Sequence, residues 1–175
     1  MPSQMLTKRH PFYQRIRGKI IHVTWVNGLR GILRDKRIRP NPTGALNHRA
    51  SGALPNCYAC QKLGGVSVLD LKSAHECDLF DRERIQHWSG VFSYYHPAIA
   101  LFLRDESIEN GLIPWPELRK MPDKSVLGEA CYRGDIPLST VIEGLVIGAS
   151  YRMVYSSSDL RSVLLRAQQV SYFSR

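Results

Sequence analysis

The stretch that most constrains the fold of this chain is residues 19–40, which read KIIHVTWVNGLRGILRDKRIRP. Its first half mixes β-branched apolar residues with two polar ones, His22 and Thr24, as in a strand that carries polar side chains out of a core. From Asn27 the period changes: apolar residues recur at helical spacing and basic residues take the opposite face. The segment predicts a strand followed by a short amphipathic helix. His22 and Thr24 are either site residues near the strand's end or simply exposed strand residues.

The size and composition of the chain indicate one domain. Its 175 residues can bury a sizeable core, and 43% hydrophobic with 22% charged residues is typical of a globular protein. We see no apolar run long enough for a membrane span and no secretory signal near the N-terminus, so we expect a cytoplasmic protein without membrane contact. Residues 1–18 are polar and basic, which suggests an N-terminal arm or a first short helix, with residues 19–175 forming the single domain. His10 and Pro11 should break any early helix.

The net charge of +9 is the most informative bulk property, with 24 Lys and Arg against 15 Asp and Glu. A basic domain attracts polyanions, which could be nucleic acid, an acidic protein or a phosphate-bearing cofactor. The alternative is an ordinary solvated surface. We expect nucleic acid as a partner.

The cysteines leave two interpretations open. Cys57 and Cys60 form a CxxC, and His75 and Cys77 follow, so these four could complete a Cys3His zinc site. The His-Glu-Cys spacing is shorter than zinc pairs usually have. Free thiols in a reducing compartment are therefore expected, together with Cys131, and no metal site is assigned.

Further along the chain, the pattern predicts alternating short elements. Residues 37–61 contain many Pro and Gly and should form a long loop, and residues 105–124 should be loop-rich. Trp115, between two prolines, is either an exposed stacking surface or a plug over the core, and we expect the plug. Strands are predicted at 66–71, 91–95, 125–133 and 144–148; helices are predicted from Pro97 and after Ser158, where Ser157 or Ser158 could be the N-cap.

The string HVTWVNGLRGIL resembles the opening motif of the ADP-ribosyltransferase-like proteins, and most closely that of the DarT-like toxins that modify nucleic acid. In that family a His-x-Thr strand is followed by Asn-Leu and a helix. Here Gly28 stands between Asn27 and Leu29. The resemblance implies that His22 and Thr24 lie beside the nicotinamide ribose of NAD and that Asn27 braces the loop or the cofactor.

A second patch, GEACYRGDIPLSTVIEGLVI, follows the family's order of a glutamate on a late strand, a turn, a Pro-Leu element and a further strand. The resemblance makes Glu129 the catalytic carboxylate, and Ser67 is similar to the serine on the family's second core strand. Tyr94 and Tyr95 could stack on nicotinamide, although core aromatics are the commoner explanation. Arg49 could reach the pyrophosphate, or it is a solvated loop residue.

What the resemblance implies is an α+β fold with split antiparallel sheets, flanking helices and an NAD cleft between the sheets. The function implied is an NAD-dependent ADP-ribosyltransferase acting on DNA or RNA, a toxin or phage-defence effector paired with an antitoxin protein. Cleavage of the nicotinamide bond develops positive charge on the ribose, which Glu129 would stabilise while His22 holds the sugar. Nicotinamide leaves without help, so the chemistry requires no metal.

Two alternatives remain open at this level. The same fold could be an NAD glycohydrolase, in which water replaces the acceptor. The chain could instead be a non-enzymatic basic nucleic-acid-binding module that stacks bases on Tyr94, Tyr95 and Trp115.

Overall fold

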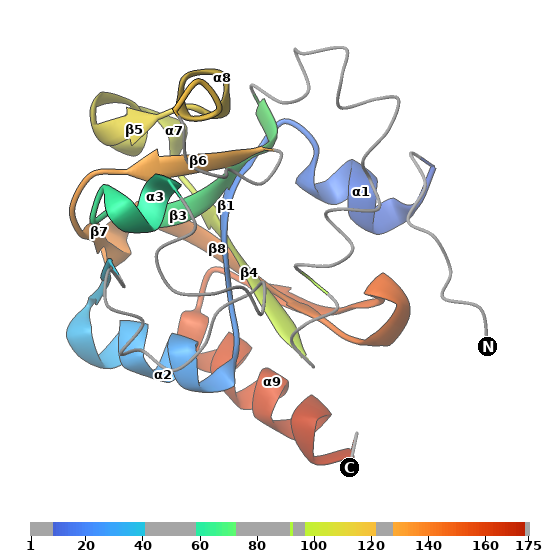
Figure 1. Cartoon of the computed structure of the whole chain (residues 1–175). Helices are drawn as coiled ribbons and strands as arrows, with labels where there is room; N and C mark the ends of the chain where they lie inside the picture. The colour runs from blue at the N-terminus through green and yellow to red at the C-terminus, as the bar shows by residue number, and fades with distance from the viewer. Residues whose placement is uncertain (1–8, 41–58, 73–91, 93–96, 122–127, 174–175) are drawn as a thin grey trace.

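The computed structural model describes residues 9–40, 59–72, 92, 97–121 and 128–173 (Figure 1). Its centre is a seven-stranded sheet in the order β5-β6-β3-β1-β4-β8-β9, and a two-stranded ladder joins β2 to β7. All ladders in this part of the chain are antiparallel. The strands are β1 (Ile20–Thr24), β2 (Arg37–Ile38), β3 (Val66–Asp70), β4 (Ala98–Leu103), β5 (Leu112–Ile113), β6 (Glu129–Tyr132), β7 (Ile136–Pro137), β8 (Val141–Ile147) and β9 (Met153–Ser157).

Helices flank the sheet. They are α1 (Pro11–Ile16), α2 (Val26–Asp35), α3 (Ala59–Lys62), α7 (Asp105–Ile108), α8 (Trp115–Leu118) and α9 (Leu160–Phe173), with single 3-10 turns at Glu109–Gly111, Leu138–Thr140 and Ala149–Tyr151. The predicted α+β class, with an antiparallel sheet and flanking helices, is confirmed at this level.

The strand and helix predicted from the opening stretch are present. β1 ends at Thr24, and Trp25, in an extended conformation, precedes the first turn of α2. Leu29 and Ile32 are buried on the inner side of α2, while Arg30 and Arg34 are exposed. The change of period in the sequence therefore marks the change from strand to helix.

The seven-stranded sheet is weakly joined in its middle. β1 and β3 pair at only two positions, Ile20 opposite Asp70 and Ile21 opposite Leu69. In contrast, β1 pairs with β4 at four positions and β3 with β6 at four. Strands β5, β6 and β3 thus form one arm and β1, β4, β8 and β9 the other, joined at one end of β1.

Each face of the sheet carries its own core. One apolar cluster lies under α1 and includes Ile21, Leu69 and Phe102. The other lies under α2 and α9 and includes Ile20, Val68 and other buried residues. Figure 1 shows α2 and α9 side by side below the sheet and α1 apart from them, and α2 and α9 contact each other. The alternation of strand residues between these clusters determines which way each site residue points.

The N-terminal segment contributes to the core. His10 and Pro11 were expected to break an early helix, but they begin one: His10 accepts a hydrogen bond from the Phe12 backbone N–H, and Pro11 occupies the first helical turn. Phe12, Tyr13 and Ile16 are buried. Of the two descriptions offered for residues 1–18, a first short helix fits the described residues 9–18.

Several predicted elements differ from the structure. The helix expected from Pro97 is wrong, because residues 98–103 form β4, whose six residues are all buried. A strand buried on both faces has a continuous apolar sequence, which helical spacing also fits. The expected loop at 105–124 contains α7, β5 and α8, and Trp115 is buried, as a plug would be.

The start of α9 also differs from prediction. Asp159 accepts a hydrogen bond from the Arg161 backbone N–H, whereas the Ser157 hydroxyl accepts from the N–H of Asp159. Asp159, not Ser157 or Ser158, therefore caps the helix. Within the described ranges, no helix has the length and apolar content needed to cross a membrane.

Candidate active site

Three of the residues singled out from the sequence come together in the structure. His22 lies on β1, Ser67 on β3 and Glu129 on β6, and these strands are neighbours in the sheet. The chain separates Ser67 from His22 by 45 residues and from Glu129 by 62. Strand pairing places all three where the two arms of the sheet meet.

Glu129 is held by Ser67. In the β3–β6 ladder, Leu69 is opposite Glu129 and Ser67 is opposite Cys131, so Ser67 and Glu129 lie on the same side of the sheet. The Ser67 hydroxyl donates a hydrogen bond to Glu129 Oε1 over 2.8 Å. Glu129 is only 5% exposed, while Ser67 is exposed. The site thus has a buried carboxylate fixed by a hydroxyl that solvent can reach.

The imidazole of His22 contacts the backbone of the same serine. Its Nδ1 lies 3.0 Å from the Ser67 carbonyl oxygen. A carbonyl only accepts hydrogen bonds, so Nδ1 must carry the hydrogen. Burial lowers the pKa of His22 below 6.5, although the contact with the Ser67 carbonyl opposes this shift. The ring is therefore neutral at pH 7, and its Nε2 has a lone pair that can accept a hydrogen bond.

His22 and Glu129 approach Ser67 from different sides. His22 alternates along β1 with Ile21 and Val23, which pack in the cluster under α1, so its side chain starts toward the opposite face. The His22 imidazole contacts the Ser67 carbonyl at the first β1 position that is no longer paired with β3, because the last paired residue is Ile21. The contacts from His22 through Ser67 to Glu129 therefore bridge the place where the sheet divides.

Thr24 and Asn27, predicted with His22, have other neighbours. Thr24 is buried, and its Oγ1 lies so close to Gly28 that a Cβ at residue 28 would be 2.2 Å away. Asn27 is exposed on α2, and its Oδ1 accepts a hydrogen bond from Arg30. These contacts give Thr24 a packing role at the turn from β1 to α2 and turn Asn27 toward the outer side of α2.

Other predicted site residues fall outside the described residues. They are Arg49, Tyr94 and Tyr95, and, for the zinc alternative, Cys57, His75 and Cys77.

The expectation of free thiols is wrong for two of the cysteines. Cys60 and Cys131 form a disulfide, with their Cα atoms 5.1 Å apart. This bond occupies the sulfur of Cys60, so Cys60 cannot also serve as the thiolate ligand that the zinc alternative needs. No group of three or more His, Cys, Asp or Glu side chains that could hold a metal occurs among the described residues.

The disulfide adjoins the candidate site, which sequence reasoning did not anticipate. Cys131 is the β6 residue opposite Ser67 and lies two positions after Glu129. The only sequence signal was that Cys131 and Glu129 share one short predicted strand.

A hollow of about 690 Å³ lies elsewhere, between the start of α1 and the turn joining β8 to β9. His10, Tyr151 and Arg152 are among its lining residues, and none of His22, Ser67 and Glu129 is. It is therefore distinct from the candidate site.

Comparison with known proteins found no match: no family model, no curated protein and no solved structure is similar to this chain.

Proposed function

We propose that this chain is an NAD-dependent ADP-ribosyltransferase that modifies a nucleic acid. The observation that carries the proposal is the meeting of His22, Ser67 and Glu129 on three adjacent strands, with Ser67 bonded to both of the others. These are the residue types, in the same chain order, that the resemblance to ADP-ribosyltransferase-like proteins assigns to the NAD site. The divided sheet also agrees with the split sheets of that fold.

The chemistry of the three residues suits the ribose of NAD. Breaking the bond to nicotinamide leaves positive charge on the ribose carbon, and a fixed carboxylate stabilises that charge. Glu129 is such a carboxylate, buried and held by Ser67. His22 starts from the opposite face of the sheet and meets Glu129 only through Ser67, at the place where the sheet divides. There a neutral His22 can accept a hydrogen bond from a ribose hydroxyl at Nε2 while Nδ1 stays on the Ser67 carbonyl. Glu129 can also deprotonate or orient the attacking group of the acceptor.

The charge of the chain supports a nucleic acid as the acceptor. A net charge of +9 attracts polyanions, and a basic surface interacts strongly with the regular phosphate charge of a nucleic acid. Modification of DNA or RNA would make the protein a toxin or phage-defence effector.

The test is release of nicotinamide from NAD by the purified protein, with and without single-stranded DNA or RNA. Glu129→Gln keeps an oxygen that can accept the Ser67 hydrogen bond but removes the charge, so release should fall at least about 100-fold. Glu143→Gln is the matched control. Glu143 is a partly buried glutamate on β8, ion-paired with Arg15, and its loss should leave release unchanged if the variant folds.

The outcomes separate the candidate functions. Release that needs nucleic acid, with ADP-ribose attached to it, supports the transferase. Release of free ADP-ribose without any macromolecule identifies an NAD glycohydrolase. If NAD neither reacts nor raises the melting temperature, or if Glu129→Gln reacts like the parent, the proposal is wrong.

A further inference from the structure

We propose that the arginine cluster, defined as Arg34, Arg37 and Arg39, is the surface on which the protein holds the phosphate backbone of its nucleic acid. The cluster lies at the end of α2 and on β2 and the residue after it. This inference rests on the proposed function for the class of substrate. Its test measures binding without NAD and is therefore independent of catalysis.

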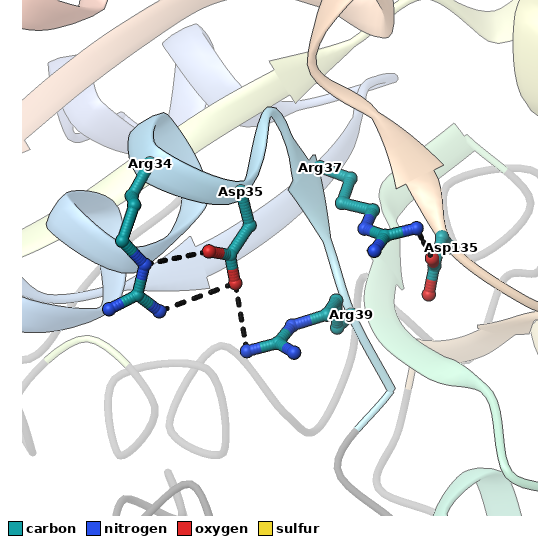
Figure 2. A network of polar contacts seen from close by, with 5 residues as sticks. All are labelled: Arg34, Asp35, Arg37, Arg39 and Asp135. Atoms are coloured by element: carbon teal, nitrogen blue, oxygen red, sulfur yellow. Dashed lines mark hydrogen bonds and ion pairs between the residues drawn. The ribbon is translucent and has the colours of Figure 1, made fainter.

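Two carboxylates fix the three guanidinium groups in position (Figure 2). Asp35 accepts from Arg34 Nε over 2.7 Å and pairs with the Arg39 guanidinium over 2.8 Å. Asp135, next to β7, pairs with Arg37 over 2.9 Å. The side chains of Arg34, Arg37 and Arg39 remain 73%, 53% and 43% exposed. The cluster is thus ordered and still open to solvent.

This arrangement favours binding of phosphates. Each guanidinium has five N–H donors in a planar fork, and the ion pairs use only one or two of them. Because the aspartates already restrict the long side chains, less conformational entropy is lost when a phosphate binds. The remaining donors can form charge-assisted hydrogen bonds with phosphate oxygens.

The charge around the cluster is concentrated. Residues 30–39 contain five cations, the three arginines with Arg30 and Lys36, against a single acid, Asp35. That is four of the nine net positive charges of the chain within ten residues. A cluster of this kind interacts strongly with the regular charge of a nucleic-acid backbone.

An acidic protein is the less favoured partner. Protein interfaces have an apolar centre with polar residues around it. The large apolar residues that are exposed in the described part of the chain are Leu63, Ile142, Met153 and Leu165. None of them belongs to residues 30–39, so the cluster offers charge without an apolar anchor.

The cluster is within reach of the candidate active site. β6 begins at Glu129, and the chain continues through a turn to Asp135, which pairs with Arg37. Six extended residues span at most about 22 Å. A strand of nucleic acid bound to the cluster can therefore extend to the carboxylate, since one strand of B-DNA advances by about 3.4 Å per base pair.

The experiment compares two charge-matched double variants. Arg37→Glu with Arg39→Glu reverses two charges in the cluster, and each arginine loses one ion pair. Lys120→Glu with Arg152→Glu reverses two exposed charges elsewhere, on the residues after α8 and before β9. Both variants change the net charge equally. Binding of a fluorescent single-stranded DNA and of an RNA of the same sequence is measured over a series of salt concentrations, after circular dichroism has shown that both variants fold.

We expect the cluster variant to bind at least about 10-fold more weakly at low salt. Its plot of log affinity against log salt should be less steep by about 0.7 for each lost phosphate contact. The control should stay close to the parent. Arg37→Lys with Arg39→Lys, which keeps the charge, should recover part of the affinity and guards against an effect of the glutamates alone.

Three results would overturn this inference. Equal weakening of both double variants would show that the nucleic acid is attracted by the overall charge and not by the cluster. Unchanged binding of the cluster variant would show that the nucleic acid binds elsewhere on the protein. If the parent binds neither DNA nor RNA, the cluster binds a different kind of partner. The proposed function fails separately, when no variant uses NAD although binding still depends on the cluster.

Discussion

The position of one proton on His22 decides what the candidate site can do. The Ser67 carbonyl fixes that proton at Nδ1, and burial keeps the ring neutral by lowering the pKa of His22 below 6.5. In the unfolded chain the ring has its ordinary pKa, so below about pH 6.5 the unfolded state binds more protons than the folded state. The contribution of His22 to the free energy of unfolding should therefore be fully present above this pH and should fall as the pH drops toward the folded pKa.

His22→Asn tests this coupling. The asparagine amide can donate to the Ser67 carbonyl in place of Nδ1 but does not titrate. Chemical unfolding of parent and variant between pH 7.5 and 5 should show a steeper loss of stability in the parent, by at most about 1.4 kcal/mol per pH unit. Parallel curves would mean that His22 titrates alike in the folded and unfolded states.

Single residues were predicted from the sequence with uneven success. His22, Ser67 and Glu129 were identified because each is a polar residue within an apolar strand pattern that also matches a family motif. Asn27 was expected near the cofactor, but it occupies the first turn of α2, whose inner side is taken by Leu29 and Ile32. Its hydrogen bond to Arg30, three residues later, follows from helical spacing. The motif predicts Asn27 beside the cofactor, and the helix period places its side chain on the exposed side of α2.

At the scale of one element, α2 explains the glycine that departs from the family motif. A Cβ at residue 28 would be 2.2 Å from Thr24 Oγ1 and 2.9 Å from a Trp25 ring carbon. Gly28 therefore allows the end of β1 to pack closely against the first turn of α2. At Gly31, in the same helix, a Cβ would meet nothing within 4 Å.

The two glycines form a matched pair for mutation. Gly31→Ala should raise the free energy of unfolding by about 0.5–1 kcal/mol, the difference in helix propensity. Gly28→Ala should lower it by about 1–3 kcal/mol, because overpacking against Thr24 outweighs the same gain in propensity. Thermal or urea unfolding measures both changes. Equal stabilisation by the two substitutions would show that the turn from β1 to α2 has room to spare.

Local signals predicted elements well where each element has one buried side. In α2 and α9 the apolar residues recur at helical spacing, so the period identifies both helices. β4 fails this test because all six residues are buried, and α1 fails because His10 and Pro11 suggest a break where they start a helix. For β4 the deciding contacts come from distant strands, β1 and β8, whereas His10 and Pro11 set the start of α1 locally.

At the scale of the whole molecule, the order of the strands could not be derived from the sequence. β1 lies between β3 and β4, and β6 lies beside β3, so the central pairings join segments far apart in the chain. Such pairings depend on the fit between surfaces, which local periodicity does not record. The family resemblance, rather than any local signal, supplied the expectation of a divided antiparallel sheet.

The disulfide between Cys60 and Cys131 is the feature on which the sequence and the structure differ most. The bond joins α3 to β6, across 71 residues of chain, at the strand position opposite Ser67. It restricts the unfolded chain and should contribute about 2–4 kcal/mol to stability. Disulfides persist in oxidising compartments and are rare in a reducing cytoplasm. The bond therefore conflicts with the expectation that the protein is cytoplasmic.

Peptide mapping without reductant shows whether Cys60 and Cys131 are linked in the protein or are free thiols. The structure predicts a cross-linked peptide containing Cys60 and Cys131, and a reductant should lower the melting temperature of the parent but not that of the Cys60→Ala and Cys131→Ala double variant. Because β6 also carries Glu129, reduction should loosen the strand that positions the carboxylate and should slow nicotinamide release if the proposed function is right. If the two cysteines are recovered unlinked and the reductant has no effect, they are adjacent thiols buried between α3 and β6.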